Sequence, residues 1–249
     1  MRVCVLISFL TAAAFAQSSL NEPYFLIRII RTGPEPGAAS VAPYERTKAA
    51  VDVIGMRSIT GPAQNWLIES HRSFGTLEGI ENALAEDPLP RGDSSDPDLY
   101  STRWIAMFRH NLSYRPDDAI KLIPMARYYQ ISVVHIRPGA DLDFAELVRL
   151  RRALFDSINL ERPELGYQVI SGTSSGTYVF IAPLQSLKVL DNGLVRVPAF
   201  AEGHGSGKAR QINADADVTR EHFLFRVEPS RSFVSDTFAG SDPGFWHGK

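Results

Sequence analysis

The sequence predicts an α+β fold made of two β-α-β-β-α-β units. Two observations support this prediction. Four short segments of the first half recur in the same order in the second half, and each half alternates between strand-like and helix-like patterns. An internal repeat constrains the architecture more strongly than any single element does.

The recurring segments indicate an internal duplication. The offsets between matched segments are 106, 111, 113 and 117 residues, so they change little along the chain. Gly55 falls on Gly166, for example, and Ile68 falls on Ile181. Four weak matches in one order favour two copies of one unit. The matched segments are 24–33 with 130–139, 55–61 with 166–172, 68–78 with 181–191, and 107–113 with 224–230.

Each copy begins with a strand and a helix. The opening strands, 25–30 and 131–136, are nearly apolar and rich in β-branched residues, as expected for strands buried on both faces. A helix is predicted at about 41–53 in the first copy. In the second copy, apolar residues recur at helical spacing over 144–158.

A hairpin, a third strand, a second helix and a last strand complete each copy. Turn residues close the hairpin at 60–63 in the first copy and at 171–176 in the second. The third strand enters the second helix directly, and the last strand closes the unit. The predicted third strands are 65–70 and 177–182, and the predicted last strands are 102–112 and 221–228.

Short polar side chains predict the N-caps of these helices. Asp141 or Asp143 precedes the apolar pattern of the helix over 144–158. Ser73 recurs as Ser186 at the start of the second helix in both copies. We therefore expect the serine to cap that helix twice.

This order of elements is that of the ferredoxin-like unit, and a unit of about 90 residues leaves one face of its sheet exposed. We expect the two sheets to pack face to face, which gives a pseudo-dimeric α+β barrel. The predicted domains are a signal peptide at 1–16, a first ferredoxin-like repeat over 17–120, and a second ferredoxin-like repeat with a C-terminal tail over 121–249.

The first sixteen residues resemble a cleavable signal peptide. Arg2 precedes an apolar run, and Ala14 to Ala16 have the small-x-small pattern of a signal peptidase site. The run is shorter than the roughly 20 residues that a membrane-spanning helix needs. A buried N-terminal strand or helix is the alternative. We expect cleavage after Ala16 and a soluble secreted or periplasmic protein that starts at Gln17.

Composition excludes several classes of function. Cys4, the single cysteine, lies in the leader, so the mature chain has no disulfide, thiolate nucleophile or cysteine metal ligand. Without Arg2, 25 basic residues stand against 28 acidic ones, which argues against a nucleic-acid surface. No metal, nucleic-acid partner or membrane span is predicted. We expect a monomer with an internal pseudo-dimer, or a homodimer.

The two strand-to-helix junctions, WLIESHRSFGTLEGI and VFIAPLQSLKVLDNG, resemble those of the dimeric α+β barrel superfamily in a fused tandem form. That group includes antibiotic-biosynthesis monooxygenase-like and NIPSNAP-like proteins. The resemblance covers about 24–114 and 130–230 and implies the barrel fold. It also implies a ligand between sheet and helices, lined by aromatic residues with one or two polar groups.

Two histidines are the candidate catalytic residues. His135 falls on Ile29 and His110 falls on Val227, so each stands where the other copy keeps an aliphatic residue. A histidine on such a strand needs a hydrogen-bond partner or a cavity, and it readily serves as a general base near neutral pH. A core histidine with satisfied hydrogen bonds is the alternative at both positions.

The candidate ligand-binding residues follow from the implied site. Trp66, Tyr167 and Tyr178 are expected to line it, and Arg57 to contact the ligand; His71, which falls on Leu184, is either a surface replacement or a site gained in one copy. Further candidates are Trp104, Phe108, Asn65 and Gln168.

Haem binding, known in some relatives, would need an axial histidine facing an open cleft. His110, His135 and His222 come with no confirming motif. No cofactor is therefore predicted.

The main functional hypothesis is an exported soluble barrel protein that binds a small apolar or aromatic molecule in a pocket of one repeat. A cofactor-independent monooxygenase or related enzyme on the same fold is the alternative, and a structural or interaction module is a second alternative. The enzyme requires a polar pair inside a closed pocket, whereas the binding protein requires only a pocket. The fold alone does not choose between them, because one scaffold hosts many functions.

Overall fold

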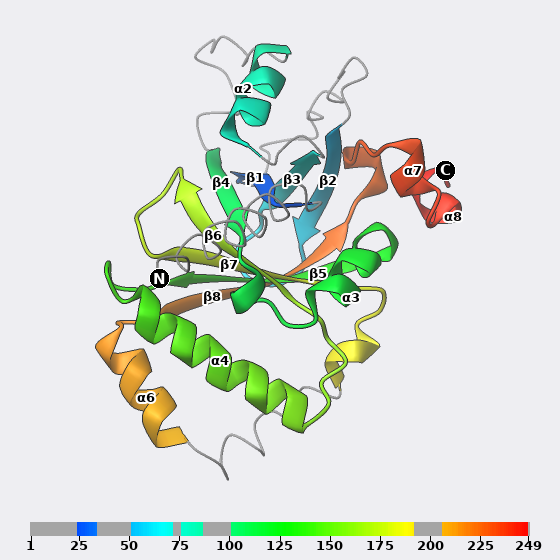
Figure 1. The fold of residues 1–249 in the computed structure, drawn as a ribbon. Helices are drawn as coiled ribbons and strands as arrows, with labels where there is room; N and C mark the ends of the chain where they lie inside the picture. The colour runs from blue at the N-terminus through cyan, green and yellow to red at the C-terminus, as the bar shows by residue number, and fades with distance from the viewer. Residues whose placement is uncertain (1–23, 34–50, 72–75, 87–100, 192–205, 249) are drawn as a thin grey trace, which may run out of the picture.

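The computed structural model describes residues 24–33, 51–71, 76–86, 101–191 and 206–248. Its eight strands pair antiparallel and close into one barrel in the order β1-β3-β2-β8-β5-β7-β6-β4, with β4 returning to β1 (Figure 1). The strands are β1 (Leu26–Thr32), β2 (Val51–Ser58), β3 (Asn65–His71), β4 (Thr102–Phe108), β5 (Tyr128–His135), β6 (Leu165–Ser171), β7 (Thr177–Leu184) and β8 (Thr219–Val227).

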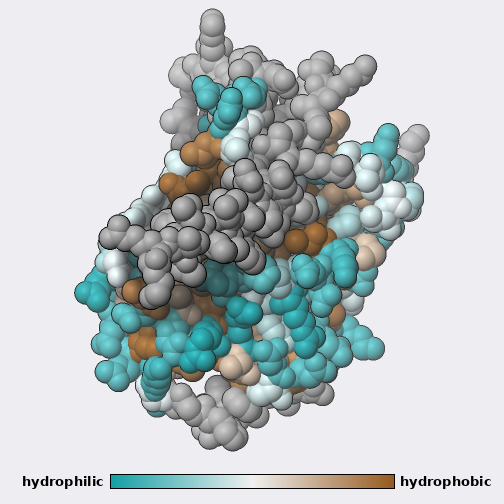
Figure 2. Space-filling view, in the orientation of Figure 1, coloured by the Kyte–Doolittle hydropathy of each residue, from teal (hydrophilic) through white to brown (hydrophobic). Residues whose placement is uncertain are grey.

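Helices lie outside the barrel. The long helix α4 packs against the outer face of β5 and β7, and α6 lies beside α4 (Figure 1). Figure 2 shows the surface over α4 and α6 as mainly hydrophilic, with a few hydrophobic side chains between polar ones. The helices are α2 (Leu77–Glu86), α3 (Pro116–Leu122), α4 (Asp141–Ser157), α6 (Ser206–Asp215), α7 (Asp236–Ala239) and α8 (Pro243–Trp246), with short 3-10 helices η2 (His110–Leu112), η3 (Ile123–Met125) and η4 (Pro229–Arg231).

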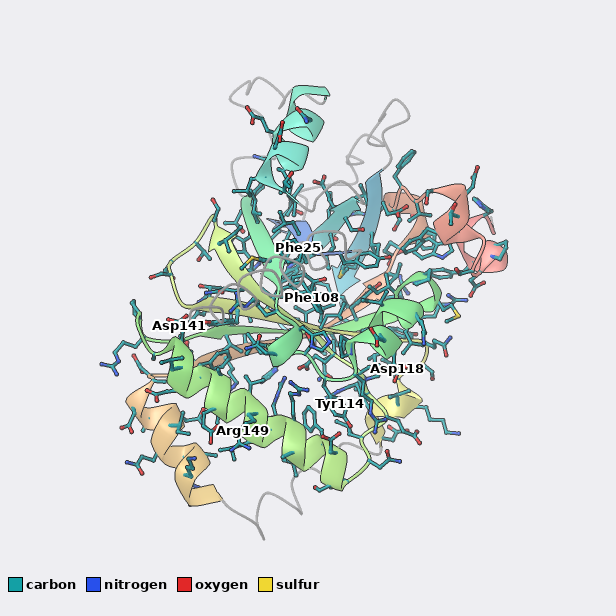
Figure 3. The ribbon with its side chains drawn as sticks, viewed as in Figure 1. Phe25, Phe108, Tyr114, Asp118, Asp141 and Arg149 are labelled. Carbon is teal, nitrogen blue, oxygen red and sulfur yellow. The ribbon has the colours of Figure 1, made fainter. Side chains whose placement is uncertain are left out.

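The interior of the barrel is a packed core. Alternate residues of every strand point inward, as the two-residue period of a strand requires. Trp66, Tyr129 and Tyr167 are among the largest fully buried side chains, and Phe108 lies within the barrel (Figure 3). The barrel is therefore filled by side chains rather than hollow.

The two halves of the barrel meet at two seams with matching contacts. At the β2–β8 seam the Gly55 amide donates to Ser232 Oγ at 2.9 Å, and at the β4–β6 seam the Gly166 amide donates to Ser113 Oγ at 2.9 Å. A Cβ added to either glycine would lie 2.4 or 2.9 Å from an atom of the neighbouring 3-10 turn. Each glycine lets the other half's turn approach its strand closely.

The predicted strands are confirmed, with differences at their ends. Both predicted hairpins are present, and Gly61 and Gly172, which fall on one another in the sequence match, have positive φ angles of 74° and 101°. The strand expected at 102–112 stops at Phe108, because the chain turns into η2. Strand order is the same in both halves, β4-β1-β3-β2 and β8-β5-β7-β6.

The helix expected at about 41–53 is wrong at its C-terminal end. Residues 51–53 begin β2, where Val53 pairs with Glu69 of β3. This segment is rich in β-branched residues, which favour a pleated strand over a helix. Residues 41–50 lie outside the described residues.

The helix expected over 144–158 is confirmed as α4, but its expected cap is wrong. Its N-cap is Ala140, with no capping side chain. Asp141 lies in the first turn (Figure 3), where its carboxylate accepts a hydrogen bond from Tyr178 Oη at 2.5 Å instead. Asp143 also lies in that turn, where its negative charge interacts favourably with the helix dipole.

The expected serine caps have different outcomes. Ser186 Oγ accepts a hydrogen bond from the Lys188 amide at 3.2 Å, as a cap would. Ser73 lies outside the described residues, and Thr76 Oγ1 instead accepts from the Gly79 amide in the first turn of α2. No helix in the described part of the chain is long and apolar enough to cross a membrane.

Candidate functional site

The two candidate catalytic histidines lie at opposite ends of the barrel. His110 is the exposed first residue of η2, after the C-terminal end of β4, and not a strand residue. Pro229 holds the same place in η4 after β8. His110 therefore corresponds to Pro229 and not to Val227, and its predicted place on an apolar strand is wrong.

Strand pairing also corrects the match of His135. Ile29 pairs with Ile68, and Ile131 pairs with Ile181. Because Ile68 and Ile181 fall on one another, Ile131 and not His135 corresponds to Ile29. His135 is the last residue of β5, and its side chain is 34 % exposed.

His135 belongs to a polar group that closes this end of the barrel. Thr177 Oγ1 donates its one proton to the Ser174 carbonyl at 2.8 Å, so it accepts from His135 Nδ1 at 3.0 Å. His135 Nε2 then faces Glu221 at 4.0 Å, and Glu221 lies 3.8 Å from Arg31. We call His135, Thr177, Glu221 and Arg31 the barrel-mouth cluster.

Arg31 fills the space where an aromatic ligand would lie. Its guanidinium carbon is 4.9 Å from the ring centre of Trp66 and 4.8 Å from that of Trp104, a cation–π arrangement. Burial lowers the pKa of Arg31, while Glu221 opposes that shift. Trp66 is fully buried and donates from Nε1 to Gln64 at 2.8 Å. The Arg31 side chain thus lies where the ligand was expected to contact Trp66.

The other predicted ligand residues do not share one cavity. Tyr167 lies in the barrel core, where its hydroxyl donates to the Tyr24 carbonyl at 3.3 Å, and Arg57 is exposed on β2. Tyr178 is buried beneath α4, where burial and its bond to Asp141 raise its pKa. His71 is the last residue of β3, and its side chain lies outside the description.

A second polar group lies on the outer face of the second half. Ser132 of β5 stands directly between Phe180 of β7 and His222 of β8 in the pairing register. Neighbouring strands are about 4.8 Å apart, so these three side chains form one row across the sheet. Ser132 Oγ lies 2.8 Å from His222 Nδ1. His222 is exposed, whereas Ser132 is 8 % exposed.

Arginines from two further segments reach this row and the neighbouring row that contains Gln130. Arg151 of α4 stacks over Phe180, with 4.5 Å between its guanidinium carbon and the ring centre, and pairs with Glu164. Arg162, in the segment before β6, donates from Nη1 to Gln130 Oε1 at 2.5 Å. The name outer groove is used below for these side chains of the outer face as a group: Gln130, Ser132, Phe180, His222, Arg151, Arg162, Arg220 and Glu164.

Burial and the neighbouring charges lower the pKa of His222. Burial, then Arg220, then Arg151 lower the pKa of His222 below its ordinary value of 6.5, against the opposing effect of Glu164. Burial also lowers the pKa of Arg162 and of Arg220. At neutral pH the outer groove therefore holds a neutral imidazole in a positive field.

Of the residues in the outer groove, only His222 was named from the sequence. Gln130 and Ser132 alternate with buried aliphatic residues in β5 and were the available signal, because polar residues at every second position mark one face of a strand. Arg151 and Arg162 carry no such mark. Among the described residues, no group of three or more His, Cys, Asp or Glu side chains is placed to hold a metal ion.

The histidines of the described residues do not fit haem. His110 lies at an exposed turn, and His135 faces a barrel end that Arg31 fills. Next to the outer groove, Phe144 of α4 packs against Phe180 with ring centres 6.1 Å apart, so α4 covers the sheet at that point. An axial ligand would need an open cleft.

Similarity to known proteins lies in the fold. No protein-family model matches the sequence, and no curated protein matches it. An anthrone oxidase-like protein of known crystal structure superposes with a TM-score of 0.57 at 10 % identity, covering 82 % of this chain and 92 % of that one. A mutant chlorite dismutase from Candidatus Nitrospira defluvii in complex with cyanide gives 0.46 at 11 % identity, covering 87 % and 96 %. The chain thus has the dimeric α+β barrel fold.

Proposed function

We propose that this protein is an enzyme that deprotonates a small aromatic substrate in the outer groove and passes the resulting carbanion to molecular oxygen without a cofactor. His222 is the general base. The observation that carries the proposal is a neutral histidine, hydrogen-bonded to Ser132 and surrounded by arginines, on the open outer face of the sheet. The fold shared with an anthrone oxidase-like protein agrees with this class of reaction.

The chemistry requires a base and a stabiliser for negative charge. In the working tautomer His222 Nδ1 donates to Ser132 Oγ, so the Nε2 lone pair is free to take a proton. Loss of that proton from a methylene that is conjugated with a carbonyl through aromatic rings leaves an enolate, whose charge the arginine field stabilises. Oxygen then converts the methylene to a carbonyl: one oxygen atom stays in the product, and the other leaves as water with the two methylene hydrogens.

This proposal replaces simple ligand binding as the main interpretation. A binding protein does not need a histidine whose pKa burial and three arginines lower, and the site on the open outer face differs from the closed pocket that the sequence led us to expect of an enzyme. The barrel-mouth cluster is less suited to substrate, because Arg31 occupies the space between Trp66 and Trp104.

Anthrone, whose methylene lies beside two aromatic rings, is the probe for this reaction. Oxygen uptake and anthraquinone formation are measured with the wild-type protein, His222→Asn and His110→Asn. Loss of a general base lowers the rate by about 10²- to 10⁴-fold, so His222→Asn should lose turnover while His110→Asn, at an exposed turn, keeps it. Equal rates for wild type and His222→Asn would rule out this base.

The barrel is further proposed to consist of two ferredoxin-like repeats, over about 17–120 and 121–249. The same strand order in both halves and the matching glycine–serine contacts at the two seams support this division. The barrel closes within one chain, so a pseudo-dimer needs no second copy. A separately determined structure of either half with another strand order would contradict it.

Export is the remaining proposal. Residues 1–16 lie outside the described residues, and the signal-peptide pattern in the sequence is its support. N-terminal sequencing of the protein from its native host should begin at Gln17. A cytosolic protein that retains Met1 would refute export.

A further inference from the structure

We infer that the substrate of the outer groove carries a carboxylate, which Arg162 and Arg151 bind while its reacting carbon lies at His222. This inference deepens the proposed function and rests on it. It gives Arg162 and Arg151 the role of binding an anionic group of the substrate, a role that the deprotonation chemistry by itself does not require.

The first support is an excess of positive charge. Besides burial, Arg151, Arg162 and Arg220 lower the pKa of His222, and within the described ranges Glu164 is the one carboxylate that raises it. Glu164 is already engaged by Arg151. Arg162 bonds to the neutral amide oxygen of Gln130, and Arg220 to that of Asn213 at 2.8 Å. One protein carboxylate thus serves three guanidinium groups.

The second support is unused hydrogen-bonding capacity. The Nε atoms of Arg151 and Arg162 are buried and have no hydrogen-bond partner among the described residues. A buried donor without an acceptor destabilises the folded protein. A small adjustment of either side chain toward a bound anion would satisfy these donors, and guanidinium groups bind the two oxygens of a carboxylate in a fork.

The third support is a comparison with the first half. There Arg28 of β1 stands between Glu69 and Ile105 in the pairing register and forms an ion pair with Glu69 at 3.0 Å. Ala182 falls on Glu69, because Ile181 falls on Ile68, and it pairs with Gln130. The second half thus has alanine where the first half places a neutralising carboxylate, and in that row Arg162 bonds only to the neutral amide oxygen of Gln130, while Glu164 acts on it from outside the row.

The surroundings favour an aromatic carboxylic acid over a phosphate monoester. Phe180 lies under Arg151, and the guanidinium carbon of Arg162 is 5.9 Å from the ring centre of Phe155, so both guanidinium groups lie over buried aromatic rings. The arginine that is already paired here binds a carboxylate. A planar carboxylate on a ring matches both features.

Binding of benzoate, benzamide and phenyl phosphate, measured by isothermal titration calorimetry at low salt, tests the inference without turnover. Benzamide has the same shape as benzoate and no charge. Benzoate should bind at least about tenfold more tightly than benzamide, a difference of about 1.4 kcal/mol. Arg162→Gln should weaken benzoate binding by a similar factor. Arg149→Gln, a matched charge change on the exposed face of α4 (Figure 3), should leave it unchanged.

Equal affinity of the wild-type protein for benzoate and benzamide overturns the inference, and so does failure of all three probes to bind. Tighter binding of phenyl phosphate overturns the assignment to a carboxylate. The comparison of probes on unaltered protein stands even if Arg162→Gln does not fold. These readouts are separate from the anthrone assay, in which turnover by His222→Asn would defeat the proposed base while leaving the benzoate preference untouched.

Discussion

Arg28 and Glu69 form an ion pair at 3.0 Å on the outer face of β1 and β3, with side chains 7 % and 0 % exposed. Two charges removed from water in this way are costly, and their mutual attraction offsets that cost only while both are present. Their strands pair directly at these two residues. The pair therefore fixes β1 against β3 in one register.

Removing one member of this pair should destabilise the fold strongly. Glu69→Ala leaves the Arg28 guanidinium buried without its carboxylate, so the free energy of unfolding should fall by about 3–5 kcal/mol. The double variant Arg28→Met with Glu69→Leu should lose less than Glu69→Ala alone, because it leaves no buried charge. Urea unfolding followed by tryptophan fluorescence measures both; a double variant less stable than the single one contradicts the prediction.

The seam glycines should not tolerate a methyl group. Gly55→Ala places a Cβ 2.4 Å from the Arg231 carbonyl oxygen, and backbone atoms there cannot move aside cheaply. We expect a loss of about 1–3 kcal/mol, as for overpacking elsewhere, seen as a lower urea midpoint. Gly207→Ala is the control: nothing lies within 4 Å of its Cβ, and α6 should gain about 0.5–1 kcal/mol. Equal effects at both glycines would refute the close approach at the seam.

The lowered pKa of His222 predicts a specific loss of stability in acid. Below about pH 6.5 the unfolded chain binds more protons at this residue than the folded chain does, because the folded pKa lies below 6.5. The contribution of His222 to the free energy of unfolding is therefore fully present above that pH and decreases as the pH falls toward the lowered value. Urea unfolding at pH 7.5 and 5.5 should show a larger loss for wild type than for His222→Asn.

The control for the acid effect is His110→Asn. Its free energy of unfolding should fall between pH 7.5 and pH 5.5 by as much as that of the wild-type protein. An imidazole titration of His222 by NMR with a midpoint above 6.5 would contradict the predicted direction. The same neutral imidazole is what the proposed base requires, so the titration also bears on function.

The C-terminal segment should contribute to stability through Trp246. Its ring is 8 % exposed and its Nε1 donates to the Pro124 carbonyl at 2.7 Å, while Asp242 pairs with Arg127. Trp246→Ala should lower the free energy of unfolding by about 3–5 kcal/mol, measured by urea unfolding. His247→Ala, next to it and exposed, should have little effect. A Trp246→Ala protein as stable as wild type would show that α7 and α8 do not hold the barrel.

Local sequence patterns predicted the elements of the second half well. The apolar spacing over 144–158 gave α4, and the turn residues of both hairpins placed Gly61 and Gly172 where φ is positive. These features depend on neighbours in sequence, such as the preference of glycine for positive φ. The failed prediction also depended on local sequence alone. The helix predicted over about 41–53 overlaps β2, because Val51 and Val53 form a strand once β3 is present to pair with them.

By itself, the sequence determined that the chain is α+β, that its halves share one order of strands, and that Gly55 corresponds to Gly166. Tertiary structure decided the register of β1 and β5, and with it the place of His135. It also assembled the outer groove, where Ser132, Arg151, Arg162 and His222 come from four segments. The physical reason is that a strand pattern reports which face a side chain occupies, whereas only the closed barrel determines which residues of other strands and helices lie beside it.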